Sequence, residues 1–227
     1  MLRKIITKCG GKRIYDRLIA PVVSRLFLEQ LIRKTGNFGS TTWLGYPIWQ
    51  NTLDLWTIQE TLAEIKPALL IECGTNRGGS ARYYSHLFDL MGHGEIVSID
   101  VEKLHELELP RVQFLLGSSV DDAIVSTVRE RVARCGGPVM VILDSDHSEA
   151  HVARELEIYS TFVTHGSYLM VQDGVIDVVS TFQKQGRPGP LPAIRKFLAK
   201  HSEFALDHER CDRFMVTHHP MGWLKRC

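Results

Sequence analysis

The sequence predicts an α/β fold, a doubly wound and mostly parallel sheet of seven strands. From residue 67 onward, short apolar runs alternate with stretches of helical periodicity, which is the pattern of a parallel sheet with crossover helices. The run 69–72 ends in an acid and is followed by a glycine-rich turn and then by a helix. Such turns, beyond the carboxyl ends of parallel strands, form the ligand-binding edge of open α/β sheets.

Composition narrows the class of protein. A chain of 227 residues with 44% hydrophobic residues is long enough to bury one substantial core. The net charge of +1 gives no reason to expect a nucleic-acid partner. The 5 cysteines are scattered without a C-x-x-C pair, which favours reduced thiols over a disulfide framework or a zinc site. No apolar run approaches the roughly 20 residues that a membrane span requires, and we expect a cytoplasmic protein.

Residues 1–66 are expected to form an N-terminal helical extension with an aromatic loop. The first 35 residues carry nine lysines and arginines against two acids. From Ile14 to Leu31, apolar residues recur at helical spacing. The favoured interpretation is a helix packed on its own domain or on a second subunit of a homo-oligomer. The alternative, a basic helix on a membrane surface, is not favoured because a charge-rich helix face is usually solvated.

Residues 36–50 are expected to be irregular, because glycines and Pro47 interrupt them. This segment and the helix after it contain three tryptophans and a tyrosine, Trp43, Tyr46, Trp49 and Trp56. These side chains either cover a ligand or form a satellite core, and the sequence leaves both open. The next helix is predicted to begin at Asn51 or Thr52 and to end before Pro67.

The remaining residues, 67–227, are expected to form the sheet and its helices. The predicted strands are 69–72, 96–100, 112–116, 139–143 and 168–171, followed by 204–207 and 213–217 as an antiparallel C-terminal hairpin with a short turn. The predicted helices are 78–91, 121–134, 148–163 and 192–200. The long segment 174–192 is expected to be a lid or a binding loop.

Two acids at predicted strand ends indicate a nucleoside site. The turn reads E-x-G-x-x-x-G-G from Glu72 onward, rather than the dinucleotide fingerprint G-x-G-x-x-G. An acid at this place would repel a pyrophosphate and would suit a cationic group, such as the amino group of S-adenosylmethionine. Asp100, 26 positions after Gly74, is placed to accept hydrogen bonds from both ribose hydroxyls. With Gly78, these residues predict a nucleoside site without phosphate; the alternative is a plain crossover with a tight turn.

The strand 112–116 ends in Gly117-Ser118-Ser119. The hydroxyls of this polar turn either hydrogen-bond an adenine edge or cap the next helix.

Two further strand ends carry acid-rich clusters, Asp144-Ser145-Asp146-His147 and Gln172-Asp173. Consecutive crossovers bring these strand ends to the same edge as the glycine turn. Hard oxygen donors converging there would hold Mg²⁺ and leave coordination positions for substrate, and a bound metal would lower the pKa of a hydroxyl for attack. His147 is the best candidate for a general base, with Asp144 and Asp146 as further catalytic candidates. The alternative is that these acids cap the helices that follow.

Matching blocks run in order through the chain: WLGxPI at 43–48, DLW at 54–56, IExGTxxGGSA at 71–81, SID at 98–100, GSS at 117–119, ILDSDH at 142–147 and GSY at 166–168. With these blocks the chain, from Thr42 onward, resembles the cephalosporin hydroxylase family, which includes rhamnosyl O-methyltransferases. The resemblance implies the Rossmann-like fold of class I S-adenosylmethionine-dependent methyltransferases. It also implies cofactor contacts at Glu72, Gly74, Asp100 and Ser119.

The resemblance further implies a divalent metal, held by Asp144 and by a Glu-Asp pair that matches Gln172-Asp173. Gln172 replaces the expected glutamate, and a neutral amide is a weaker Mg²⁺ ligand than a carboxylate. The predicted metal ligands are Asp144, Gln172 and Asp173. The predicted cofactor-binding residues are Glu72, Gly74, Gly78, Ser80, Asp100, Ser118, Ser119 and Asp144.

Together these features predict an S-adenosylmethionine-dependent O-methyltransferase. Its acceptor is expected to be a hydroxyl of a sugar, a glycan or a similar polyhydroxylated molecule, with assistance from Mg²⁺. The alternative is a catalytically silent, S-adenosylmethionine-binding partner subunit of another biosynthetic enzyme, which the glutamine at position 172 would suit. A nicotinamide-dependent oxidoreductase is disfavoured by the spacing of the glycines.

Overall fold

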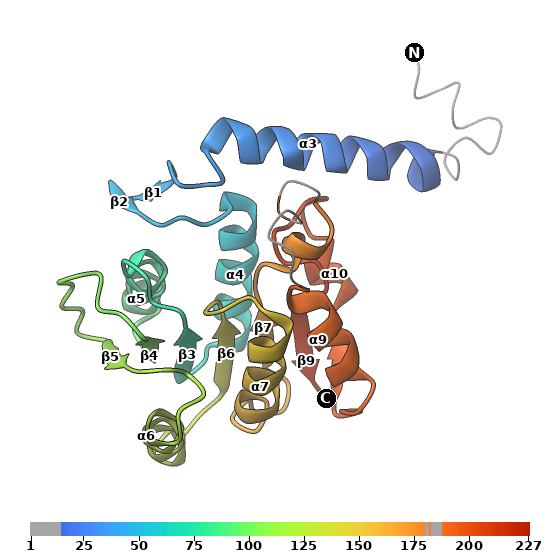
Figure 1. Cartoon of the computed structure of the whole chain (residues 1–227). Coiled ribbons are helices and arrows are strands. Elements are labelled where there is room, and N and C mark those ends of the chain that lie inside the picture. The colour runs from blue at the N-terminus through green and yellow to red at the C-terminus, as the bar shows by residue number, and fades with distance from the viewer. Residues whose placement is uncertain (1–14, 180–181, 183–187) are drawn as a thin grey trace.

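The computed structural model describes residues 15–179, 182 and 188–227. Its centre is a sheet of seven strands in the order β5-β4-β3-β6-β7-β9-β8 (Figure 1). The five parallel strands are β3 (Leu69–Cys73), β4 (Glu95–Asp100), β5 (Val112–Leu116), β6 (Val139–Leu143) and β7 (Tyr168–Val171). The last two, β8 (Phe204–Leu206) and β9 (Trp223–Arg226), pair antiparallel. The predicted mostly parallel, seven-stranded sheet is confirmed.

Helices cover both faces of the sheet. One face packs on α4 (Thr52–Ile65) and α5 (Gly79–Met91), and the other on α6 (Asp122–Ala133), α7 (Glu149–Tyr159) and α9 (Pro190–Leu198). Along β3, Leu70 faces the first pair, whereas Leu69 and Ile71 face the other three helices, as the two-residue period of a strand requires. Because both faces are covered, the strand reads as a continuous apolar run. The predicted helices are confirmed within a few residues, except that α7 ends at Tyr159 and not near residue 163.

The prediction of the last strand was wrong. Residues 213–217 are not a strand, and the connection from β8 to β9 holds the short helix α10 (His208–Cys211) in place of a short turn. Arg213 forms an ion pair with Glu60 of α4 at 2.9 Å, on the protein surface. Trp223 and Leu224 of β9 are buried instead, with β9 placed between β7 and β8. Burial of these side chains, rather than local β-propensity, selects the strand.

The N-terminal helix α3 (Ala20–Thr35), preceded by the π-helical turn η1 (Tyr15–Ile19), lies at the edge of the molecule, away from the sheet (Figure 1). Its buried side chains are Leu28 and Ile32, so packing on its own domain is confined to its second half. Six apolar side chains before them are exposed, namely Leu18, Ile19, Val22, Val23, Leu26 and Phe27. The basic residues 3–13 and Ile14 lie outside the described residues. No helix in the described part is long and apolar enough to cross a membrane.

Part of the aromatic loop is regular, contrary to the prediction. Strands β1 (Thr42–Trp43) and β2 (Tyr46–Pro47) form a small antiparallel ladder. The two residues between them, Leu44 and Gly45, both have positive φ, 50° and 79°, which is the backbone of a type I′ hairpin turn. Trp43 packs edge-on against Tyr83 of α5, with ring centroids 4.9 Å apart. This tryptophan therefore packs at the margin of the main core on the α4–α5 face and does not line the cavity described below.

The segment 174–192 begins with the 3₁₀ turn η2 (Gly174–Asp177). Its far end is tied back by Asp177, whose carboxylate accepts hydrogen bonds from the backbone N–H groups of Gly189 and Leu191 at 2.7 and 2.8 Å. Residues 180–181 and 183–187 lie outside the described residues, so a lid here stays a prediction. The division of the chain at residue 66 also stays a prediction.

Candidate active site

A cavity of about 960 Å³ opens at the carboxyl ends of the parallel strands. Its walls come from the segments that follow β3, β4, β5, β6 and β7, together with residues 37–39, 47–51 and His218-His219. The sheet order places the β5, β4 and β3 ends on one side and the β6 and β7 ends on the other. The cavity is thus the ligand-binding edge that the strand pattern predicts.

The turn after β3 needs its glycines for close packing. Gly74 has a φ of +103°, and a Cβ there would lie 2.0 Å from the carbonyl oxygen of Asp144. Gly78 has a φ of +77° as the N-cap of α5, and a Cβ on Gly79 would lie 2.2 Å from the carbonyl oxygen of Pro47. The turn therefore brings together the ends of β3 and β6 and the aromatic loop.

Asp100 holds the loop that follows β3. Its two carboxylate oxygens accept the backbone N–H groups of Asn76 at 2.7 Å and Glu102 at 3.1 Å. All three residues line the cavity. The carboxylate is thus fixed in the wall, with lone pairs left for a ligand.

Glu72 lies beneath the cavity and does not line it. Its side chain is 1% exposed and accepts a hydrogen bond from the Ser98 hydroxyl. Burial raises the pKa of this carboxyl from 4.5 to about 7, while the hydroxyls of Ser80 and Ser98 oppose the rise. Ser80, in the first turn of α5, does line the cavity. Glu72 therefore reaches the cavity through Ser80.

Ser118 and Ser119 line the cavity, whereas Gly78 is not among its wall residues. The Ser119 hydroxyl donates to the carboxylate of Glu155, a buried residue of α7. Tyr159 donates from its hydroxyl to the backbone carbonyl of Ser119 at 2.8 Å. These contacts fix the turn after β5 against α7.

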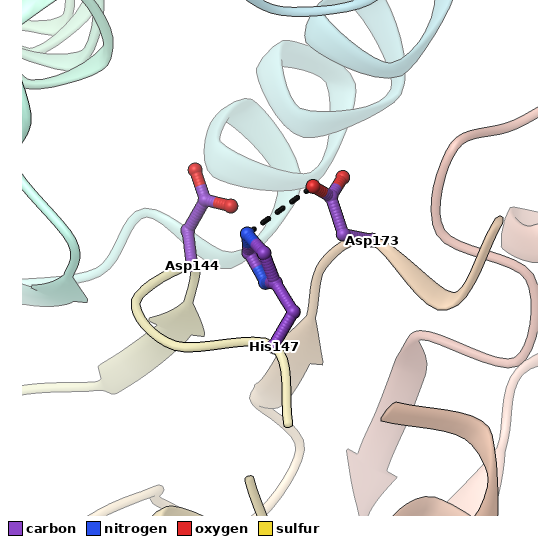
Figure 2. A group of neighbouring side chains, drawn as sticks. All are labelled: Asp144, His147 and Asp173. Atoms are coloured by element: carbon purple, nitrogen blue, oxygen red, sulfur yellow. Dashed lines mark ion pairs between the residues drawn. The ribbon is translucent and has the colours of Figure 1, made fainter. Parts of the chain in front are cut away.

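Three side chains from two neighbouring strand ends converge in the cavity. Asp144, His147 and Asp173 each offer a ligand atom, and these atoms all lie within 4.8 Å of one another. Figure 2 shows the three side chains pointing toward a common point, with His147 Nε2 and Asp173 Oδ2 3.2 Å apart. Burial and the charge of Asp173 raise the pKa of Asp144. Two close carboxylates and an imidazole fit a divalent cation, which would relieve this repulsion.

Asp146 has a different place. It is exposed at the cavity wall, and its Oδ1 accepts the backbone N–H of Ser148 at 2.7 Å, just before α7 begins. This contact closes a turn ahead of α7 and is not a helix cap, because the N-cap is Ser148 and no side chain caps the helix. Its side chain is not in the converging group of Asp144, His147 and Asp173.

Gln172 lies behind the cluster and is 1% exposed. Its amide nitrogen is turned toward Asp144 and donates to that carboxylate at 3.2 Å, and Gln50 Nε2 donates to Asp144 Oδ2 at 2.9 Å. Sequence reasoning missed Gln50, because a glutamine in a loop 94 positions before Asp144 carries no local signal. The structure thus places Gln172 beside the cluster and not in the cavity wall.

The backbone of Asp173 is held in an unusual conformation. Its φ of +58° lies in the left-handed region, which costs a residue other than glycine some energy. Its N–H donates to Nδ1 of His219 at 2.9 Å, and His219 is 1% exposed. Burial lowers the pKa of the neighbouring His218 to about 4. These contacts indicate that the histidine pair has a structural role, which is to hold the backbone at Asp173.

The family model described as rhamnosyl O-methyltransferase/CmcI matches residues 36–227. The chain belongs to this family. A rhamnosyl O-methyltransferase of Mycobacterium tuberculosis is 34% identical over 193 residues, covering 82% of this chain and 78% of that protein. The rhamnosyl O-methyltransferase of Mycobacterium leprae is 31% identical over 201 residues, covering 84% and 86%.

The fold is also that of a solved CmcI structure described as holding Mg and SAM. This likeness has a TM-score of 0.65 at 17% identity, and covers 84% of this chain and 78% of that one. The family resemblance and the class I methyltransferase fold predicted from the sequence are therefore confirmed. As a member of the rhamnosyl O-methyltransferase/CmcI family, the chain is an S-adenosylmethionine-dependent O-methyltransferase.

Proposed function

We propose that this enzyme methylates a hydroxyl of a rhamnosyl or similar sugar acceptor, with assistance from a divalent cation such as Mg²⁺. One observation carries the proposal: the converging group Asp144, His147 and Asp173 opens into the same cavity as Asp100 and the turn after β5. A donor site and an acid-base site would thus face each other across one cavity. The curated relatives named rhamnosyl O-methyltransferase support a sugar acceptor.

We assign the cofactor to the side of the cavity formed by β3, β4 and β5. Asp100 would accept hydrogen bonds from the ribose hydroxyls. The turn after β3 would let the backbone approach the ligand at Gly74. Ser118 and Ser119 would face the adenine edge, and Glu72 would act from below through Ser80. The bound cofactor supplies an electrophilic methyl group on a sulfonium. The fixed walls would hold donor and acceptor in line, so positioning is expected to dominate the rate.

We assign the cation and the proton transfer to the side formed by β6 and β7. Asp144 and Asp173 would hold the ion, with Gln172 as a neutral amide behind them, because Mg²⁺ prefers oxygen ligands. Bound there, the cation would lower the pKa of the acceptor hydroxyl. His147 would accept the hydroxyl proton, and Asp173 at 3.2 Å would stabilise the imidazolium. Asp146, in the same wall, is the second candidate for the base.

The test is mass spectrometry of reactions that contain S-adenosylmethionine, Mg²⁺ and a panel of rhamnosides and other pyranosides. We expect one added methyl on a rhamnoside for the wild type and a large loss of rate for His147→Ala, of roughly 10²-fold or more. Cofactor binding without transfer to any sugar would favour the alternative, a partner subunit that binds the cofactor and is catalytically silent. The neutral side chain of Gln172 supports this alternative, because an amide is a weaker Mg²⁺ ligand than the expected glutamate.

We also propose a cytoplasmic homo-oligomer, in which a second copy covers the exposed apolar side chains of η1 and α3. The support is that Leu18, Val22 and Leu26 are 67%, 56% and 57% exposed within one chain. Light scattering during size-exclusion chromatography tests this point. We expect a mass above that of one chain for the wild type and a shift toward one chain for Leu26→Glu. A basic membrane-surface helix is the less favoured alternative, and binding of the wild type to anionic vesicles would support it.

A further inference from the structure

We infer that the indole of Trp49 is the platform on which the acceptor sugar ring is held. This inference rests on the proposed function, because it names the place of that reaction's acceptor. Trp49 lines the cavity and is 57% exposed, while the residues on either side of it, Ile48 and Gln50, are only 6% and 7% exposed. Both neighbours of Trp49 are thus buried, whereas its own indole is turned outward into the cavity.

The residue that follows Trp49 in the chain contacts the candidate metal cluster. The following residue, Gln50, donates from Nε2 to Asp144 at 2.9 Å. Ile48, before Trp49, lies on Gly79 at the start of α5.

The indole itself points the other way: it is hydrogen-bonded to Asn37, whose Oδ1 lies 3.2 Å from His218 Nε2, and the next residue, His219, holds Asp173 after β7. A ring on this side is placed for the acceptor and not for the adenine of the cofactor.

The indole is held rigidly. Trp49 has a φ of +49°, a left-handed conformation that is unfavourable for a bulky residue. Its Nε1 donates to the carbonyl oxygen of Asn37 at 2.8 Å, and Asn37 also lines the cavity. The backbone of Ile48 donates to the carbonyl of Thr41 at 3.1 Å, which fixes the loop on the other side. A ring held by the hydrogen bond to Asn37 loses little entropy on binding.

The chemistry of a pyranose suits such a ring. One face of the sugar presents C–H groups that gain by leaving water, and its hydroxyls lie at the rim. An aromatic face can cover the C–H face, while polar groups of the cavity serve the hydroxyls. A deoxy sugar such as rhamnose adds a methyl group to the apolar area. This arrangement would orient a hydroxyl toward the cluster of Asp144, His147 and Asp173.

The chain offers a matched control in Trp56. This tryptophan, on α4, is also 57% exposed, but it does not line the cavity. The experiment compares wild type with Trp49→Ala, Trp49→Phe and Trp56→Ala. The probe is p-nitrophenyl α-L-rhamnopyranoside, whose methylation gives KM and kcat. Calorimetric binding of S-adenosylhomocysteine reports separately on the cofactor side and on folding.

We expect Trp49→Ala to raise KM for the rhamnoside by about tenfold or more, with cofactor affinity unchanged within about twofold. Trp49→Phe should recover most of the loss because it keeps an aromatic face, and Trp56→Ala should match the wild type. An unchanged KM in Trp49→Ala would overturn the platform and leave the proposed function standing. Weakened cofactor binding in Trp49→Ala, with circular dichroism unchanged, would also overturn it, because the ring would then serve the cofactor.

If the rhamnoside is not methylated, a direct binding measurement still tests whether Trp49 holds the sugar. Saturation-transfer NMR would be run on the wild type, loaded with S-adenosylhomocysteine, against rhamnoside, glucoside and galactoside. Binding that is lost in Trp49→Ala and kept in Trp56→Ala would support the platform. Absence of binding by every pyranoside would overturn it. Methyl transfer to a hydroxyl that is not on a sugar would then mark the proposed acceptor, and not the methyltransferase class, as the error.

Discussion

At the scale of single residues, Glu72 and Asp144 are two acids at neighbouring strand ends in different surroundings. Glu72 is sealed beneath the cavity and receives neutral hydroxyl donors from Ser80 and Ser98. Asp144 faces the cavity beside a second carboxylate, Asp173. The first environment suits a protonated or hydrogen-bonded acid, and the second suits a cation ligand. We therefore expect the pH dependence of stability to report on Glu72 and the metal dependence of activity to report on Asp144.

Glu72 should make the ligand-free protein less stable as the pH rises. Its native pKa of about 7 lies above its ordinary value of 4.5, so the folded protein retains a proton that the unfolded chain releases. This stabilisation is fully present below the unfolded-state pKa of 4.5 and is lost as the pH rises through the native pKa of about 7. The free energy of unfolding should fall by an amount on the order of 3 kcal/mol. Urea unfolding from about pH 5 to about pH 8 should show this loss in the wild type and not in Glu72→Gln. Parallel pH profiles for the two proteins would refute it.

Gln172 should set the metal requirement. Replacing it with glutamate adds a carboxylate beside Asp144, so Gln172→Glu should lower the Mg²⁺ concentration for half-maximal activity by about tenfold. In EDTA the same variant should melt below the wild type, because two adjacent acids then lie together without a cation. Asp144→Asn should lose metal-dependent activity and largely keep cofactor binding. Activity and melting temperature are measured against Mg²⁺ concentration; full wild-type activity in EDTA would rule out the metal role.

At the scale of elements, the turn after β3 joins the sheet to the site. Gly74 allows the ends of β3 and β6 to touch, and Gly79 allows the aromatic loop to lie on the start of α5. Gln50 extends from that loop to Asp144. One turn thus sets the spacing between the candidate cofactor and metal sides.

Gly74→Ala should therefore be severely destabilising. The added Cβ would lie 2.0 Å from the Asp144 carbonyl oxygen, a contact with backbone that cannot move freely. We expect a loss of about 3 kcal/mol or more. Gly92→Ala is the control, because Gly92 also has a positive φ, +74°, but nothing lies within 4 Å of its Cβ, so it should lose only roughly 1–2 kcal/mol. Equal losses in chemical denaturation would show that the contact with Asp144 carries no weight.

The sequence predicted elements better where the signal was local. The five parallel strands were found because each is a short, largely apolar run ended by a polar turn. The last strand was misplaced because 213–217 and 223–226 are both short, and only burial between β7 and β8 distinguishes them. At the site, Asp144, His147 and Asp173 follow strands and could be predicted together. Gln50 could not, because its contact with Asp144 depends on the packing of a loop far away in the chain.

At the scale of the whole molecule, the strand order arranges the chemistry across one edge of the sheet. The ends of β5, β4 and β3 carry the candidate cofactor residues, and the ends of β6 and β7 carry the candidate metal and base residues. We infer that this edge binds the cofactor on its β3–β5 side. Titration calorimetry of S-adenosylhomocysteine into the wild type, Asp100→Ala and Asp144→Asn tests the claim most directly.

We expect saturable binding of one ligand per chain in the wild type. Asp100→Ala should bind roughly tenfold or more weakly, because the ribose hydroxyls lose a charged acceptor, and Asp144→Asn should bind nearly as well as the wild type. Circular dichroism confirms that each protein is folded. Absence of binding by the folded wild type, or equal affinity in Asp100→Ala, would contradict the account.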